Sequence, residues 1–164
     1  MIKKLVLACL IALPAMAFAQ KFGYVDTQSL LGSLPAMKEV QTQLEATTAK
    51  YEAELTNLRT ELEKKYTEFQ QMEESTPAAI KERRVQEITE LEQKIQQFRS
   101  TAAQDIQSQQ EKLMAPIQQQ VMTAIKSVGS EGSFTFIFES GYMLYTGTEV
   151  VDVTPLVKTK LGIK

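Results

Sequence analysis

The sequence contains no histidine, and its single cysteine, Cys9, lies near the N-terminus. Without histidine the chain lacks the commonest general base and metal ligand at neutral pH. The paired carboxylates, such as Glu73 with Glu74 or Glu149 with Asp152, have no second group or pocket around them, and the glycine spacing matches no phosphate loop. We therefore expect no enzymatic activity, no metal and no cofactor.

The first 19 residues have the features of a secretory signal peptide. Lys3 and Lys4 precede an apolar stretch from 5 to 16 that is too short to span a bilayer, and Ala17-Phe18-Ala19 is a small-x-small cleavage site. We expect cleavage after Ala19 and export to the periplasm. An alternative is a lipoprotein, because residues 6–9 loosely resemble a lipid-attachment box, but the apolar region would then be cut almost at its start.

Removal of residues 1–19 takes away the only cysteine and leaves an acidic chain. All 20 acidic residues remain while two of the 18 basic ones are lost, so the formal net charge becomes 16 − 20 = −4. Nucleic acid is therefore not an expected partner. An exported protein without disulfides must gain its stability from packing or oligomerisation. No second hydrophobic run follows, so we expect the processed chain to be soluble.

Composition divides the processed chain into three parts. Residues 20–34 and 129–164 hold its glycines and most of its β-branched and aromatic clusters, whereas residues 35–128 hold most of the Gln, Glu and Lys. We predict an α+β fold in which both chain ends form a small β-rich oligomerisation body. The middle part forms a long antiparallel coiled-coil hairpin, called the arm, with its tip near residues 73–77.

The arm is predicted from apolar residues at alternating three- and four-residue steps, the spacing of a coiled-coil seam. Its first limb should begin near Ser33 and Pro35, with the hydroxyl as N-cap, and run to about Glu74; the second should begin at Thr76-Pro77. Pro116 removes a backbone donor inside the second limb and predicts a kink or break there. The seam includes Val40, Leu44, Tyr51, Leu55, Leu58, Leu62, Leu91, Ile95, Ile117 and Val121.

The chain ends have the two-residue period of strands. Residues 22–25 are a strand candidate, and residues 134–139 and 142–145 predict a β-hairpin around the turn Ser140-Gly141. Short helices are expected from Asp26-Thr27 and from Thr154-Pro155, the latter ending at Gly162. So small a core is marginal alone, so we expect subunits to share an aromatic core. The candidates are Phe22, Tyr24, Phe134, Phe136 and Phe138.

The order of these segments resembles the Skp (OmpH) family of periplasmic chaperones. The resemblance rests on the leader, the opening strand 21–26 leading into Gln28-Ser29-Leu30, the charged helical hairpin, residues 124–128 and a strand pair ending in Asp152-Val153-Thr154. It implies a homotrimer whose three helical arms enclose a cavity. Such a trimer takes in unfolded outer-membrane β-barrel proteins without ATP and prevents their aggregation.

Apolar residues near the distal end of the arm are the candidates for client contact. The alternative for each of them is that it only packs one limb against the other. The candidates are Tyr66, Phe69, Met72, Ile80 and Ile88.

A basic group near the tip, Lys81, Arg83 and Arg84, can make weak contact with lipid headgroups, although such a cluster beside Glu82 and Glu87 is usually a solvated face. Some family members carry paired arginines near the root of the second limb. Residues 107–111 here read Gln-Ser-Gln-Gln-Glu, so no lipopolysaccharide site is assigned.

A second function class stays open from the sequence: a structural coiled-coil adaptor or spacer of the cell envelope. An adaptor usually carries large domains on both flanks of its hairpin, and a spacer needs a lipid anchor or a wall-binding module. The flanks here are short, and neither module is visible. Either alternative would bind one defined partner, whereas a holdase would accept several unrelated unfolded barrels.

Overall fold

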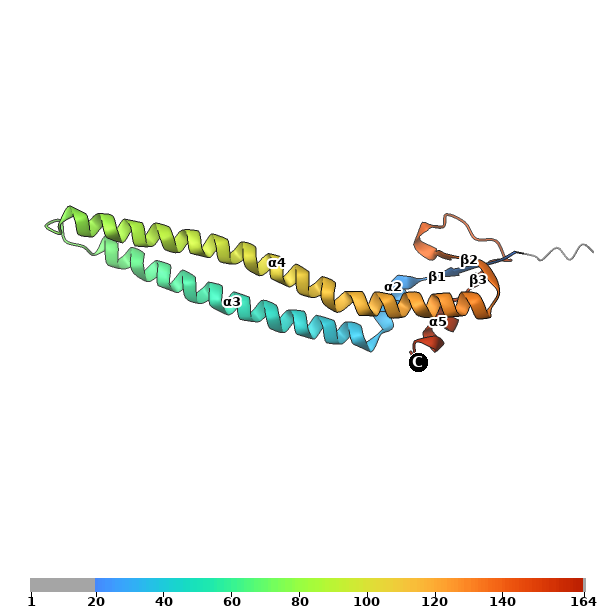
Figure 1. Ribbon diagram of the computed structural model, residues 1–164. Coiled ribbons are helices and arrows are strands. Elements are labelled where there is room, and N and C mark those ends of the chain that lie inside the picture. The colour runs from blue at the N-terminus through green and yellow to red at the C-terminus, as the bar shows by residue number, and fades with distance from the viewer. Residues whose placement is uncertain (1–19, 164) are drawn as a thin grey trace, which may run out of the picture. The chain divides into compact units, whose positions relative to one another are not determined.

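The computed structural model describes residues 20–163, so the predicted signal peptide lies outside the described residues. The elements in order are β1 (Lys21–Val25), α2 (Thr27–Ser33), α3 (Pro35–Gln70), α4 (Ala78–Glu131), β2 (Phe134–Glu139), the 3-10 helix η1 (Ser140–Tyr142), β3 (Val151–Asp152) and α5 (Thr154–Lys160). Long helices with a small sheet from both chain ends confirm the predicted α+β fold (Figure 1). Within residues 20–163, no helix combines the length and apolar composition needed to cross a membrane.

The chain divides into two compact units. A helical unit comprises Gln28–Met122, and a sheet unit comprises the described residues up to Thr27 together with Thr123–Gly162. The arm belongs to the helical unit from Pro35 to Met122, and α4 continues into the sheet unit.

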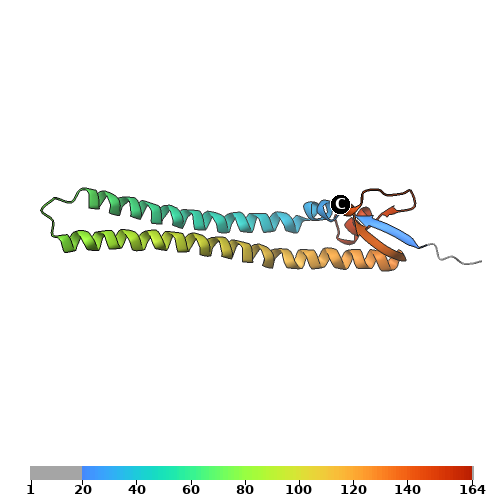
Figure 2. The ribbon, with the colours of Figure 1, turned by 90° about the horizontal axis from the view of Figure 1, so that it is seen from above.

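The two limbs of the arm, α3 and the first part of α4, run antiparallel and side by side (Figures 1 and 2). A 36-residue helix such as α3 is about 54 Å long at 1.5 Å per residue. Its seam has a buried cluster of Leu58, Leu91 and Ile95, against which Leu55, Leu62 and Phe98 pack. The three- and four-residue spacing of the apolar residues therefore does produce helix-on-helix packing, because these positions share one face of each limb.

The ends of the limbs differ in detail from the sequence prediction. The first limb stops at Gln70 and not near Glu74, so residues 71–77 form the connection. Ser33 is not the N-cap of α3: it ends α2, and its hydroxyl donates a 2.7 Å hydrogen bond to the carbonyl of Ser29. Leu34 is the N-cap residue and has no side-chain capping bond, while Pro35 occupies the first turn as predicted.

Pro116 does not break the second limb. The helix α4 is continuous from Ala78 to Glu131 with Pro116 inside it, so of the predicted kink or break, the break is wrong and the kink stays a prediction. Proline removes one backbone donor, which is a local loss. Ile117 and Val121, just after it, are each only 5% exposed, so packing holds the helix on this side of the proline.

The sheet is parallel throughout, which corrects the predicted β-hairpin. Its strand order is β2-β1-β3, and β1 pairs in parallel with both neighbours. After β2 the chain turns through η1, where the amide of Met143 donates to the carbonyl of Ser140, and residues 142–145 form no strand. The third strand comes later, at Val151–Asp152, and pairs with the edge of β1 that β2 leaves free.

Side chains and backbone groups fasten both chain ends to the sheet. The Thr154 hydroxyl accepts a hydrogen bond from the amide of Asp26 at 3.0 Å, and the Glu139 carboxylate accepts one from the amide of Thr27 at 3.2 Å. The amide of Val153 donates to the carbonyl of Tyr24 at 2.9 Å. Gly162, with a φ of 71°, follows α5 as predicted, because glycine adopts this left-handed conformation without steric cost.

Candidate functional site

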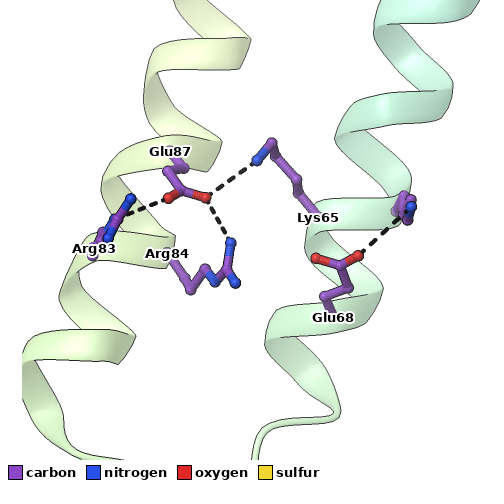
Figure 3. Close-up of polar contacts among 6 residues, drawn as sticks. Lys65, Glu68, Arg83, Arg84 and Glu87 are labelled. Carbon is purple, nitrogen blue, oxygen red and sulfur yellow. Dashed lines mark hydrogen bonds and ion pairs between the residues drawn. The ribbon is translucent and has the colours of Figure 1, made fainter.

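A charged cluster joins the two limbs near the tip of the arm. The Glu87 carboxylate accepts hydrogen bonds from Lys65 on α3 at 3.2 Å, and from Arg84 at 2.9 Å and Arg83 at 3.2 Å on its own helix (Figure 3). The bonds from Lys65 and then Arg84 lower the pKa of Glu87 below the ordinary glutamate value, against a smaller opposing effect of burial. Two cations of the predicted basic group are therefore already bound to a carboxylate.

The third cation of that group, Lys81, is also engaged. Its ammonium group donates a 3.1 Å hydrogen bond to the backbone carbonyl of Glu74, in the connection between the limbs. All three cations of the predicted basic group are therefore held by hydrogen bonds within the arm.

The five predicted client-contact residues separate into accessible and buried positions. Tyr66 is 40% exposed and Ile80 is 47% exposed, whereas Ile88 is only 6% exposed. Phe69 and Met72 are half-buried. The burial of Ile88 assigns it to packing within the arm, because a side chain so enclosed presents little surface to another molecule.

Tyr66 also fastens the limbs to each other through its polar end. Its hydroxyl donates a 2.7 Å hydrogen bond to the Glu92 carboxylate on α4, and this bond raises the pKa of Tyr66. The side chain is thus partly accessible while its hydroxyl is held in place.

Val85 is an exposed apolar residue that the sequence analysis missed. It is 47% exposed and lies between Arg84 and Gln86 on α4. The periodicity analysis selected only seam positions, and Val85 is off the seam. A signal was nevertheless present, since an apolar residue on the charged face of a coiled coil is not needed for limb packing.

The middle of the arm replaces seam packing with a polar layer. The Tyr51 hydroxyl and the Gln109 amide both donate to the Asp105 carboxylate at 2.7 Å, and the Thr47 hydroxyl donates to the Gln109 carbonyl oxygen at 3.1 Å. The bond to Asp105 raises the pKa of Tyr51. The Tyr51 ring meets the Phe98 ring edge-on at a centroid distance of 5.7 Å. This layer connects the limbs without a large buried apolar side chain.

An exposed aromatic face covers one side of the sheet unit. Phe22 and Phe136 stack with ring centroids 6.3 Å apart and an interplanar angle of 4°, and Phe136 also stacks on Phe138 at 5.9 Å. Phe136 is 57% exposed and Phe138 is 47% exposed, although both are large and apolar. Tyr24, which pairs with Phe138 in the register, is half-buried.

Phe134 does not belong to this aromatic face. The register between β1 and β2 shifts between Lys21 and Phe22, which leaves Thr135 without a partner and separates Phe134 from the next two phenylalanines. The Phe134 ring lies against Gly23, where an added Cβ atom would come within 3.0 Å of it. The Lys21 ammonium group lies 4.1 Å from the ring centroid. Phe134 thus packs within its own unit.

The segment after η1 exposes further apolar side chains that were predicted to be a strand. Tyr142 is 89% exposed and Tyr145 is 88% exposed, and Leu144 between them is fully exposed. They are additional apolar surface of the sheet unit. Among residues 20–163, no three His, Cys, Asp or Glu side chains come together in a way that could hold a metal ion.

The described chain matches a known protein family. The family of OmpH-like outer membrane proteins matches residues 21–161, nearly all of the described chain. The chain belongs to this OmpH-like family. That result confirms the family resemblance seen in the sequence.

A solved structure shares the OmpH-like fold. It is a crystal structure from Caulobacter crescentus, of an OmpH-like protein described as a candidate outer membrane chaperone. It matches with a TM-score of 0.75 at 16% sequence identity, covering 87% of this chain and 83% of that one. No curated protein matches the chain.

Proposed function

We propose that this OmpH-like chain is an ATP-independent holdase chaperone of the periplasm. It binds unfolded outer-membrane β-barrel proteins in a cavity between helical arms and prevents their aggregation. The observation that carries the proposal is the exposure of large apolar side chains, Tyr66, Ile80 and Val85, in the distal part of a polar and charged arm. Unfolded barrels expose apolar strands with unpaired edges, and scattered weak contacts can shield them without holding them tightly.

The proposal includes assembly into a homotrimer through the sheet unit. Phe136 and Phe138 leave about half of their surfaces in water in the single chain. Covering a phenylalanine side chain is worth about 1.5 to 3 kcal/mol when it goes from full exposure to full burial. Shared burial of the aromatic face therefore contributes to association, and the number of three chains comes from the family resemblance.

The client contacts proposed at the distal arm are the accessible ones. Tyr66 and Ile80 provide the largest surface, Phe69 and Met72 contribute their exposed parts, and Val85 is added to them. Contact of the tip with anionic lipid remains a weak, secondary proposal, because Glu87 already pairs with Arg83 and Arg84.

The test is light-scattering mass after size exclusion, for the processed protein alone and after dilution of a urea-unfolded outer-membrane barrel into it. We expect a mass near three chains that rises by one client, while the barrel alone aggregates. The folded barrel is the control and should not bind. A stable oligomer that leaves the unfolded barrel to precipitate would contradict the holdase and favour the adaptor or spacer.

A further inference from the structure

A groove opens along the beginning of α3, within the helical unit. It has a volume of about 700 Å³, within the range of roughly 300 to 1,000 Å³ that is typical of ligand sites. Its floor is apolar and formed by Leu34, Met37, Val40 and Leu44, with Met114 across from them on α4. Leu34 and Val40 are buried, whereas the two methionines and Leu44 are half-buried and keep surface available.

The groove exists because the seam is not closed by a large apolar pair at this level. On α4 the lining residue next to Met114 is Gln110, an exposed amide. On α3 the facing positions are the small residues Thr48 and Ala49. The polar layer of Tyr51, Asp105 and Gln109 begins directly beyond, so the limbs are joined there by hydrogen bonds and not by packing.

Carboxylates dominate the charged rim of the groove. Glu45 and Glu52 line it two helical turns apart, against a single cation, Lys38. Within residues 20–163 neither carboxylate takes part in an ion pair, and the contact made by the Glu45 carboxylate is a 2.9 Å hydrogen bond from the neutral amide of Gln41. The rim is therefore complementary to a positively charged group lying above an apolar floor.

We propose that this groove binds an extended segment of unfolded polypeptide in which large apolar side chains lie next to a basic residue. The inference rests on the proposed holdase function and places a client site inside each arm, between its two limbs. Methionine side chains are flexible and polarizable, so a floor with Met37 and Met114 can fit apolar side chains of different shapes. A second copy of this chain matches the acidic rim less well, because the chain itself is acidic overall.

The first experiment uses the methionines as reporters. The full-length processed protein is labelled with ¹³C at its methionine methyl groups, and a urea-unfolded outer-membrane barrel is diluted into it. We expect the Met37 and Met114 signals to shift or broaden. Met122 is the control, since it is on α4, 49% exposed and not part of the groove, and its signal should stay unchanged.

The outcomes separate this inference from the proposed function. If the barrel stays bound and soluble while Met37 and Met114 are unaffected, the groove site is wrong and the holdase stands. If the barrel is not held, the holdase is wrong, and a short synthetic peptide of alternating Phe and Lys decides the groove by shifting these two signals or not. If both signals depend on protein concentration without any client, a second copy fills the groove and the inference is overturned.

The second experiment reverses the rim charge. The double variant E45K/E52K should raise the dissociation constant of the Phe/Lys peptide about threefold to tenfold, as expected for two solvent-exposed charge contacts. The control E39K/E54K makes the same change in net charge at exposed positions of α3 outside the groove. It should change the dissociation constant of the peptide by less than about twofold. Equal effects of both variants would show general electrostatics and would overturn the site.

Discussion

Lys65 and Glu87 connect the two limbs of the arm through a 3.2 Å ion pair near its tip. They come from different helices, whereas Arg84, the other main partner of Glu87, lies three residues before it on the same helix. The carboxylate thus links one limb to the other while its remaining charge is compensated locally. This ion pair therefore joins the limbs close to the point where they pass into the connection between them.

Acid should weaken this ion pair. The pKa of Glu87 is lower in the folded protein than its ordinary value, so its stabilising contribution is present above the ordinary pKa and is lost as the pH falls through the lowered one. Glu87→Gln should therefore lower the urea midpoint at pH 7, with the difference from the parent shrinking as the pH falls toward 3. Glu82→Gln, at an exposed position on the same helix, is the control and should leave the urea midpoint at pH 7 unchanged.

Removal of a seam side chain should cost far more than removal of an exposed one. Leu58 is 4% exposed in the cluster with Leu91 and Ile95, so Leu58→Ala should destabilise the protein by about 2 to 5 kcal/mol. Val85→Ala, at a 47% exposed position, should cost about 1 kcal/mol or less. Urea unfolding followed by helical circular dichroism measures both. Similar losses for the two variants would mean that Leu58 does not belong to a packed seam.

The aromatic face of the sheet unit should control assembly. Phe136→Asp places a charge where shared burial is proposed, and it should dissociate the oligomer and abolish holding activity together. Thr135→Asp is the matched control, because Thr135 is exposed on the same strand but has no partner in the register. Light-scattering mass and suppression of barrel aggregation are the two readouts. A Phe136→Asp variant that stayed trimeric and active would refute the proposed role of this face.

Exposed apolar residues of the distal arm should affect client affinity without affecting assembly. The double variant Ile80→Ser/Val85→Ser should weaken binding of an unfolded barrel about fivefold to tenfold, as expected from the loss of two partly covered apolar contacts. Leu156→Ser, at a 50% exposed position on α5, serves as the control and should leave the affinity unchanged. Unchanged binding by the arm variant would exclude this part of the arm as a contact surface.

Replacement of Pro116 should stabilise the second limb. Pro116→Ala restores a backbone donor inside a continuous helix but also gives the unfolded chain more conformational entropy. The net free energy of unfolding should rise by about 2 kcal/mol. Pro35→Ala is the matched control: in the first turn of α3 a backbone donor has no partner within the helix, so no gain is expected. A Pro116→Ala variant that unfolds at lower urea concentration than the parent would contradict this account.

The arm was predictable from sequence because its information is local. Helical packing repeats every three or four residues, so Leu58, Leu91 and Ile95 were identified before any partner was known. The same reasoning could not distinguish Ile80, which is exposed, from Ile88, which is buried, because both fit the period. It also missed Val85, which is off the seam.

The sheet was less predictable because strand pairing is not local. Alternation identified β2 correctly, but nothing in residues 134–145 shows that β2 pairs with β1, more than 100 residues earlier, instead of turning back on itself. The two-residue strand β3 is too short for alternation to reveal, and a strand ending near Asp152 was indicated by the family resemblance alone. The register shift at Lys21 and Phe22, which removes Phe134 from the aromatic face, leaves no sequence signal that we recognise.

Because β1 is the central strand, it determines when the sheet can form during synthesis, and the length of the arm can vary without affecting it. Since β1 pairs with strands that begin at Phe134 and Val151, the sheet cannot close until the ribosome has passed them, and its formation is expected to be slow compared with that of the arm. In the sequence the arm lies between β1 and β2, which pair with each other, so it has the position of a long insertion. Equal lengths can therefore be removed from both limbs, in multiples of seven residues that keep the seam in register, without changing a single strand pair.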